Sequence, residues 1–410
     1  MTAAYGSFDS FDSFDELADV YGKHLAPGKL DHYRQLGLLL VMGKRDNIYF
    51  EHHFTGQRFI NCHANGGCYN LGHCHPQVTA AVREALGTLD IGNHHLLSAP
   101  RARLAERLSA TTDHLLSRVV FGVSGGEAID LALKVARAST RRRDIISVAG
   151  GYHGHTGLAV ATGDPSFRDW FGPNPEGFLQ VPYDDVAAMD RAIDDETAAV
   201  IVEAIPATLG MSLPSDGYFA ELRRLCDERG ARLIIDEVQT GIGRTGKWWG
   251  YQHEAIVPDA IVTAKALSGG IYPISATLLT PEMHAALDEG PNPMAHISTF
   301  GGAELGCIAA SAVLDIVGAP GFLARVATVG ERLESGLRGL PLTVRRRGMF
   351  MGLAFASQEE ADRAMMKLMF AGVFAFPAGN DRRVLQFLPP LILTDEQTAE
   401  LIGRVRGALG

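Results

Sequence analysis

Cysteine is scarce in this sequence, with 5 residues in a chain of 410. An odd and scattered set of cysteines does not build a disulfide framework, which favours a reducing compartment such as the cytoplasm. No apolar run approaches the length of a membrane span. The N-terminal segment also lacks the basic region and apolar core of a signal peptide. The sequence therefore predicts a cytoplasmic protein without a membrane segment.

An excess of basic residues is also missing, because the formal net charge is −10 at pH 7. A negative balance argues against binding to nucleic acid or to an anionic membrane surface. Hydrophobic residues make up 46% and charged residues 20% of the chain, which is ordinary for a globular enzyme. With 410 residues the chain is too long for one simple core, so two domains are expected.

One stretch gathers residue types that bind metals. Asn61–Pro76 reads NCHANGGCYNLGHCHP and holds three of the five cysteines. Thiols and imidazoles suit zinc. Structural zinc sites pair their ligands as C-x2-4-C, however, whereas these cysteines lie six residues apart with no second pair later in the chain. The spacing favours no metal, with zinc as the alternative.

Short apolar runs rich in Val and Ile alternate with helical patterns in the middle of the chain. Such runs predict an α/β fold with a mostly parallel sheet that is covered on both faces. The predicted strands are Val119–Val123, Ile145–Ala149, Ala199–Ile205, Arg232–Asp236, Ala260–Ala264 and Ile274–Leu279.

Beyond Thr299 the pattern changes to two helices, short strands and a last helix, which predicts a smaller α+β domain. We place the large domain at residues 66–300 and the small domain at residues 301–410, with the N-terminal segment 1–65 joining the small one. The repeat FDSFDSFDE near the N-terminus is interpreted as a frayed arm rather than a docking segment.

The segment Gly241–Gly246, GIGRTG, matches the G-x-G-x-x-G fingerprint of nicotinamide enzymes. That fingerprint requires its first glycine at the strand end and a helix that opens across the last. Here DEVQT intervenes, and KWWGYQ after the match has no helical stripe. A nicotinamide-dependent oxidoreductase is therefore only a remote alternative.

Three segments carry the chemistry. A strand leads into Ser124–Gly126 and a helix, where Ser124 and Glu127 predict a capping box and the glycines suit a phosphate. Asp236 ends a strand at the edge where parallel sheets bind ligands, and its carboxylate would suit a protonated aromatic nitrogen. Lys265 follows another strand, where removal of an amine from water favours its neutral, nucleophilic form. Each feature alone has an ordinary structural explanation, but together they predict pyridoxal 5′-phosphate as the cofactor.

With these segments in place, the sequence resembles the class III (subgroup III) pyridoxal-phosphate-dependent aminotransferases of fold type I. This is the family of the ornithine, acetylornithine and 4-aminobutyrate enzymes. The resemblance runs from about Phe59 to Pro390. It rests on NLGHCHP, SGGEAIDLALKVAR, GGYHGHT, IVEA, IIDEVQTGIGRTG, TAKALSGG, STFGG and VLQFLPPL. In this family the first motif runs toward the active-site mouth and binds no metal, which leaves Cys62, Cys68 and Cys74 as small fillers.

The resemblance implies a role for each matching residue. Lys265 would bond to the cofactor and later move the proton, and Asp236 would bind the pyridine nitrogen. The other implied cofactor contacts are Val238 and Tyr152 on the two ring faces, Gln239 near the phenolic oxygen, Glu203 behind the pyridine side, Gly125 and Gly126 at the phosphate, and Thr299 from the neighbouring subunit. The implied partners are an amine donor, a carbonyl acceptor and a second copy of the chain, in a homodimer with shared active sites.

Three positions depart from the family pattern. Gly126 stands where a hydroxyl residue is common, so one phosphate contact would be missing. Gln386 replaces the arginine that clamps the substrate α-carboxylate in members that use glutamate. Thr208 replaces the glutamate that neutralises this arginine.

We therefore expect a biosynthetic aminotransferase whose substrate lacks the usual arginine-clamped α-carboxylate. A racemase, epimerase or decarboxylase of the same family is the alternative, because the cofactor motifs do not separate these reactions. Arg382, Arg383 and Arg345–Arg347 could replace the missing clamp, although surface charge is their more ordinary role.

Overall fold

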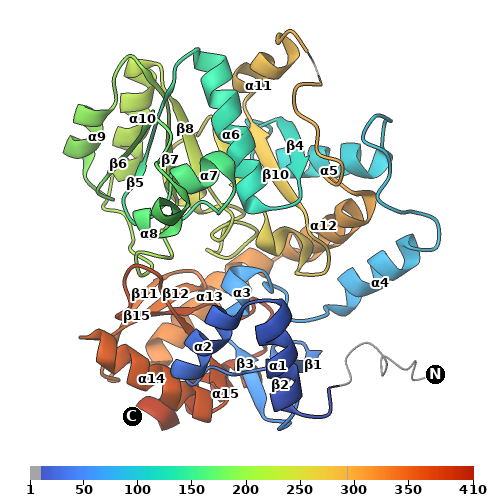
Figure 1. Ribbon diagram of the computed structural model, residues 1–410, viewed down its shortest axis with the longest axis vertical. Helices are drawn as coiled ribbons and strands as arrows, with labels where there is room; N and C mark the ends of the chain where they lie inside the picture. The colour runs from blue at the N-terminus through green and yellow to red at the C-terminus, as the bar shows by residue number, and fades with distance from the viewer. Residues whose placement is uncertain (1–10, 293) are drawn as a thin grey trace.

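The computed structural model describes residues 11–292 and 294–410. Figure 1 shows two lobes, an upper one built around a seven-stranded sheet and a lower one that contains two four-stranded sheets. The first helices (blue) and the last helices (red) lie together in the lower lobe. These are α1 (Phe14–His24), α2 (Pro27–Gln35), α14 (Gln358–Phe370) and α15 (Asp395–Leu409).

The seven-stranded sheet has the order β4-β10-β9-β8-β7-β5-β6. All neighbours are parallel except β10, which runs antiparallel to β4 and β9. The predicted α/β fold with a mostly parallel sheet is confirmed. The strands are β4 (Arg118–Gly122), β5 (Asp144–Val148), β6 (Phe178–Val181), β7 (Thr197–Glu203), β8 (Arg232–Asp236), β9 (Ala260–Thr263) and β10 (Ser275–Leu279).

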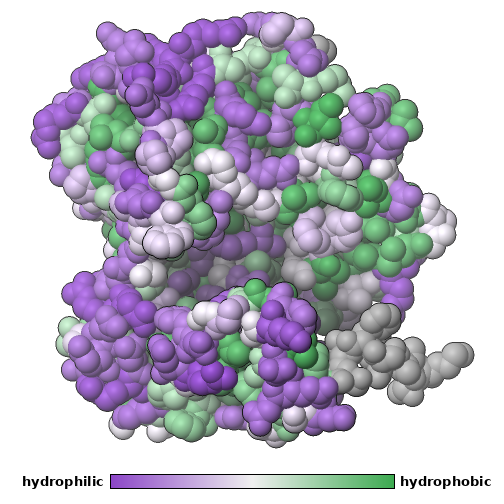
Figure 2. Space-filling view, in the orientation of Figure 1, coloured by the Kyte–Doolittle hydropathy of each residue, from purple (hydrophilic) through white to green (hydrophobic). Residues whose placement is uncertain are grey.

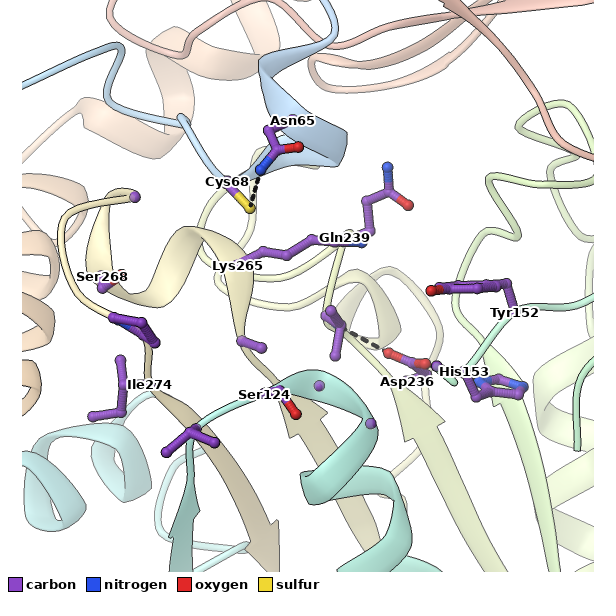
Figure 3. Close-up of a pocket in the computed structure, with 18 of the residues that line it drawn as sticks. Asn65, Cys68, Ser124, Tyr152, His153, Asp236, Gln239, Lys265, Ser268 and Ile274 are labelled. Carbon is purple, nitrogen blue, oxygen red and sulfur yellow. Dashed lines mark hydrogen bonds and ion pairs between the residues drawn. The ribbon is translucent and has the colours of Figure 1, made fainter. Parts of the chain in front are cut away.

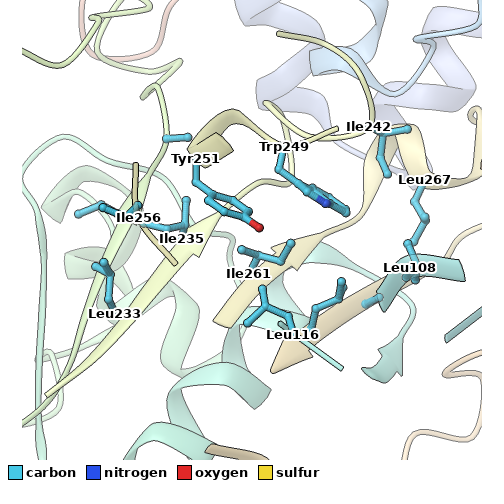
Figure 4. Packing of buried hydrophobic residues seen from close by; sticks show 14 of the residues in the cluster. Leu108, Leu116, Leu233, Ile235, Ile242, Trp249, Tyr251, Ile256, Ile261 and Leu267 are labelled. Atoms are coloured by element: carbon cyan, nitrogen blue, oxygen red, sulfur yellow. The ribbon is translucent and has the colours of Figure 1, made fainter. Parts of the chain in front are cut away.

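Both faces of this sheet are buried, which explains the continuous apolar runs. In β7, Val200 and Val202 belong to one core cluster, whereas Ala199 and Ile201 belong to another on the opposite face. Figure 4 shows part of the first cluster, where Trp249 packs among strand and helix side chains. Helix α6 (Gly125–Thr140) covers the second face, and the first is covered by α5 (Ala99–Ala110), α10 (Tyr218–Arg229) and α12 (Glu304–Val317).

The lower lobe joins the two ends of the chain. Strand β13 (Val373–Phe374) pairs with β3 (Arg58–Asn61) beside β1 (Met42–Asp46) and β2 (Tyr49–His52). The second small sheet contains β11 (Thr343–Arg347), β12 (Phe350–Ala354), β14 (Phe376–Pro377) and β15 (Val384–Phe387). The domain boundaries after residues 65 and 300 stay a prediction.

The other helices connect these layers. They are α3 (Ala64–Gly67), α4 (Pro76–Ala85), α7 (Gly157–Ala161), α8 (Pro165–Arg168), η1 (Asp169–Phe171), α9 (Val186–Ala192), η2 (Gly250–His253), η3 (Lys265–Ser268), α11 (Pro281–Asp288) and α13 (Phe322–Gly336). In the described part of the chain, no single helix combines the length and apolar character needed to cross a membrane, and α12 with α13 reaches them only as a pair bent by 69°.

The N-terminal repeat is more ordered than the sequence analysis expected. Its first three residues, 8–10, lie outside the described residues. Ser13 caps α1 by accepting a hydrogen bond from the Glu16 amide, and the Phe14 ring meets Phe54 edge-on at a centroid distance of 6.2 Å. The interpretation as a frayed arm is therefore wrong from Ser13 onward, because a cap and an aromatic contact hold this part.

Candidate active site

A cavity of about 630 Å³ lies where the C-terminal ends of the parallel strands meet the lower lobe. Figure 2 shows the surface hollowed between the two lobes, and Figure 3 shows part of the cavity lining. The register pairs Glu203 with Asp236, so these strand ends lie at one edge. Most predicted cofactor residues line the cavity: Gly125, Gly126, Tyr152, Glu203, Asp236, Val238, Gln239 and Lys265.

The start of α6 forms one wall. The Ser124 hydroxyl accepts from the Glu127 amide at 3.3 Å, as a capping box requires. The Glu127 carboxylate, however, accepts from the Val123 amide at 2.6 Å rather than from that of Ser124. Only one of the two hydrogen bonds of the predicted box is formed. The backbone before the helix turns the Val123 N–H, instead of the Ser124 N–H, toward the Glu127 carboxylate.

The glycines keep the free amides of this first turn clear of their own side chains. Gly125 and Gly126 have no intrahelical acceptor for their N–H groups, and a helix N-terminus attracts anions. A Cβ at Gly125 would meet Val238 at 3.3 Å, and a Cβ at Gly126 would meet the Thr156 hydroxyl at 2.6 Å. The residues present therefore fit a phosphate group that approaches the backbone closely.

Asp236 has a buried partner that the sequence analysis missed. His153 Nδ1 lies 2.8 Å from Asp236 Oδ2, and the other carboxylate oxygen accepts from the Val238 amide at 2.9 Å. Burial lowers the pKa of His153, but the hydrogen bond and charge of Asp236 and the charge of Glu203 outweigh it, so the pKa is raised. The motif GGYHGHT contains this histidine and was the available signal. The pair holds the carboxylate in one orientation at the cavity floor.

Glu203 supports the loop that carries Tyr152. Its carboxylate accepts from the Tyr152 amide at 3.0 Å and from the Ala207 amide at 3.3 Å. Burial raises the pKa of Glu203 to about 7, with the charge of Asp236 adding to the effect and that of His153 opposing it. The Tyr152 ring meets Phe167 edge-on at 5.5 Å, so Glu203 holds the backbone of Tyr152 and Phe167 contacts its ring.

Lys265 begins η3 with a φ of 39°, in a region that residues other than glycine rarely adopt. Such strain costs on the order of 1–3 kcal/mol and is concentrated at functional sites. The side chains of Lys265 and Gln239 both end beside Gly66. A Cβ built on Gly66 would lie 3.5 Å from Lys265 Nζ and 3.6 Å from Gln239 Nε2. Figure 3 shows the Lys265 side chain reaching toward Gln239.

The predicted substrate residues and Thr299 lie outside the lining. Gln386 Oε1 accepts from Gln239 Nε2 at 3.2 Å, so it touches a lining residue from the lower lobe. Thr208 donates to the Gly150 carbonyl at 2.8 Å, which ties two loops together. Thr299 is exposed on the surface of this chain.

The arginines considered as substitutes for the clamp have other partners. Arg345 donates to the Gly210 carbonyl at 2.7 Å and lies 3.7 Å from the Asp381 carboxylate. The remaining four lie near carboxylates, in the pairs Arg346–Glu334, Arg347–Glu254, Arg382–Asp362 and Arg383–Asp381. Among the described residues that line the cavity, Lys265 is the only lysine or arginine.

The three cysteines of the stretch Asn61–Pro76 have different environments. Cys62 is buried, Cys68 lines the cavity and Cys74 is exposed, so only Cys62 is a filler in the expected sense. In residues 11–292 and 294–410, no group of three or more His, Cys, Asp or Glu side chains is placed to hold a metal ion. The expected absence of a metal stays a prediction.

The GIGRTG segment has a structural role instead of a nucleotide-binding one. It lies in a run of turns, and the next helical turn, η2, begins only at Gly250. Arg244 is fully buried and donates to the side chain of Asn70 and to the carbonyls of Met349 and Pro389. Burial lowers the pKa of Arg244 to about 9. This arginine joins the two lobes beside the cavity, which the fingerprint analysis did not predict.

Comparison with known proteins gives a consistent result. The family model described as Aminotransferase class-III matches residues 33–409. An uncharacterized aminotransferase from Archaeoglobus fulgidus is 45% identical over 400 residues, covering 96% of this chain and 94% of that protein. The ornithine aminotransferase of Toxoplasma gondii superposes with a TM-score of 0.89 at 26% identity, covering 97% of this chain and 95% of its own. An amine transaminase from an uncultivated Pseudomonas species, in its PLP-bound form, gives 0.82 at 26% identity, covering 90% and 94%.

Proposed function

The chain belongs to the class-III aminotransferases of fold type I, and from this premise we propose that it moves an amino group from an amine whose carboxylate is not clamped by arginine. Enzymes of this family depend on pyridoxal phosphate and use an amine donor and a carbonyl acceptor. The proposed biosynthetic role rests on the unusual substrate pocket, and the proposed cytoplasmic location rests on the sparse cysteines.

The residues of the cavity fit the cofactor in chemical type. Gly125 and Gly126 would hold the phosphate, Asp236 the ring nitrogen, and Lys265 the aldehyde carbon. When bound, pyridoxal phosphate supplies an aldehyde that condenses with amines and a ring that takes up the electron pair left at Cα. Val238 and Tyr152 would enclose the ring.

Asp236, Lys265 and Gln239 would each have a different role toward the bound cofactor. The Asp236 carboxylate, oriented by the Val238 amide and His153, would keep a proton on the ring nitrogen. The Lys265 amine would take the proton from the substrate Cα and return it to the former aldehyde carbon of the cofactor. Gln239 lies beside the amine and would donate to the phenolic oxygen.

The proposal about the substrate depends on one observation. The side-chain amides of Gln386 and Gln239 are in contact at the position where the family's glutamate-using members have an arginine guanidinium. Gln386 contacts Gln239 at 3.2 Å and donates to the Pro377 carbonyl at 3.4 Å, so its amide is already engaged. Charged hydrogen bonds are roughly twice as strong as neutral ones, so replacing a bidentate clamp by one amide lowers carboxylate binding by about 2–3 kcal/mol, or about 30- to 150-fold.

The variant Gln386→Arg tests this proposal. We expect wild type to react weakly with glutamate, and the variant to lower the glutamate concentration needed for half-maximal conversion of the cofactor to its amine form by about 30- to 150-fold. Stopped-flow absorbance with glutamate alone measures this half-reaction. Arg383→Gln, at an exposed position paired with Asp381, is the control and should change nothing. Efficient use of glutamate by wild type, unchanged in Gln386→Arg, would disprove the proposal.

A second candidate is an amino-acid epimerase or decarboxylase of the same family. The lack of an arginine clamp among the described lining residues favours it, because a reaction with one substrate needs no site for an oxo-acid acceptor. Incubation of candidate amines in deuterated water separates these reactions. An epimerase exchanges the Cα hydrogen without an oxo acid, a decarboxylase releases CO2, and an aminotransferase accumulates the amine form of the cofactor.

A homodimer with shared active sites is part of the proposal. Thr299 lies on the surface between Ile297 and Phe300, whose exposed fractions are 45% and 55%. Arg101 binds the carbonyls of Asn93 and Gly302, which brings the neighbouring loop close, and Leu97 in that loop is fully exposed. Such an apolar patch is typical of an interface between subunits. From there Thr299 would reach the phosphate in the second copy.

A further inference from the structure

Position 126, in the proposed phosphate site at the start of α6, has no hydroxyl because it is glycine. The hydroxyl of Thr156 lies in the space beside it. A Cβ built on Gly126 would come within 2.6 Å of Thr156 Oγ1 and within 3.3 Å of its methyl carbon. The Thr156 side chain therefore fills the volume that a side chain at position 126 would need. Both residues line the cavity.

The backbone of the Thr156 segment is seated on the start of α6. Gly154 has a φ of 124°, and a Cβ on it would lie 2.8 Å from the Gly126 Cα and 3.3 Å from the Gly126 nitrogen. This close approach requires glycine at position 154. It fixes Thr156 beside the first-turn amides of α6 and keeps its hydroxyl within reach of the same guest.

The Thr156 hydroxyl is also unusually free. Thr156 precedes α7, yet its side chain makes no capping hydrogen bond. The other serine and threonine N-caps of the described helices all accept one: Ser13, Ser98, Ser124, Thr280, Ser357 and Thr394. No other hydrogen bond of this hydroxyl occurs within residues 11–292 and 294–410. Thr156 is exposed and lines the cavity, so its uncapped hydroxyl is open to a ligand that enters there.

We propose that Thr156 Oγ1 donates to the cofactor phosphate the hydrogen bond that position 126 lacks. This inference rests on the proposed function, since it assigns a further residue to the same phosphate site. It also explains why position 126 is glycine, because Thr156 excludes a side chain there. The space beside the phosphate site therefore holds one hydroxyl-bearing side chain, which can come either from position 126 or from position 156.

The test compares binding of two ligands to the full chain after removal of its cofactor. One ligand is pyridoxal 5′-phosphate, and the other is pyridoxal, which lacks the phosphate. Thr156→Val keeps the shape and removes the hydroxyl, so its Kd for pyridoxal phosphate should rise about ten- to one-hundred-fold, as for loss of a hydrogen bond to a charged group. Its Kd for pyridoxal should stay that of wild type. Thr156→Ser should retain tight binding of pyridoxal phosphate.

An exchange variant protects the test against a simple folding defect. Thr156→Ala with Gly126→Ser moves the hydroxyl across the gap and should recover most of the affinity that Thr156→Ala alone loses. Unchanged phosphate-dependent affinity in Thr156→Val, or an equal loss for pyridoxal, would overturn the inference while leaving the proposed function intact. Failure of wild type to bind pyridoxal phosphate at all would overturn both.

Discussion

At the scale of single residues, the buried pair of His153 and Asp236 links the site to pH. The histidine is fully buried and its pKa is raised by its hydrogen bond with the carboxylate, against the opposing effect of burial. A group whose folded pKa is raised stabilises the fold fully below its unfolded pKa of about 6.5, and this contribution is lost as the pH rises through the folded pKa. The pair therefore contributes most under mildly acidic conditions.

The variant His153→Gln should lower the free energy of unfolding by about 1.5–3 kcal/mol at pH 6, because a hydrogen bond to a charged group is lost. The loss should be smaller at pH 9 than at pH 6, because the histidine gives up its charge as the pH rises through its raised folded pKa. Urea denaturation at both values measures the difference. His284→Gln is the matched control, since His284 pairs with the exposed carboxylate of Asp288. Equal losses at both pH values would contradict the assignment of charge to His153.

Sequence reasoning identified Asp236 because it ends a recognisable buried strand, and Lys265 because it follows another. It missed His153, which lies in a loop without periodicity and 83 positions from its partner. Only the pairing of strands brings such residues together, so no local pattern could reveal the contact. Arg244 was missed for the same reason, because its acceptors at positions 70, 349 and 389 belong to distant segments.

At the scale of elements, Glu237 organises the turns between β8 and η2. The side chain is fully buried and accepts from the Thr240 hydroxyl and from the amides of Gly250 and Tyr251. Burial nevertheless raises the pKa of Glu237 to about 7. The folded chain then holds a proton that the unfolded chain has released above about pH 4.5, so stability falls as the pH rises from 4.5 to 7.

Glu237→Gln should reduce this fall by up to about 3 kcal/mol, since the amide does not titrate and one pKa unit corresponds to about 1.4 kcal/mol. The readout is the difference in unfolding free energy between pH 5 and pH 8, which does not depend on any constant effect of the substitution. Glu282→Gln, at an exposed side chain, should leave the difference unchanged. A wild-type-like difference in Glu237→Gln would show that the carboxylate is ionised throughout.

Elements were predictable where burial is uniform. Strand β8 was predicted at its observed bounds, because every residue from Leu233 to Asp236 is buried. Strand β6 was missed, since Leu179 is exposed on this edge strand and the run is short. Helix α1 was missed because its FDSFDSFDE sequence suggested an unfolded arm, whereas an N-cap and an aromatic contact stabilise the helix.

At the scale of the whole molecule, the cavity depends on how the lobes meet. The upper lobe supplies the cofactor residues, and the lower lobe brings Gln386 against Gln239. Arg244 fixes this arrangement through carbonyls of the lower lobe. The two-part architecture was predicted from the change in the pattern of helices and strands beyond Thr299. The fit between lobes, and hence the shape of the substrate pocket, arises from contacts between distant segments and has no local signature.

The central claim is that this chain carries pyridoxal phosphate on Lys265 and uses it for amino transfer. Borohydride reduction of the purified protein makes the bond between a lysine amine and the cofactor permanent, and peptide mapping by mass spectrometry then locates it. We predict the pyridoxyl mass on the peptide that contains Lys265, and no labelled lysine in Lys265→Ala. A label on another lysine such as Lys247, or no label on protein purified with the cofactor present, would contradict the account.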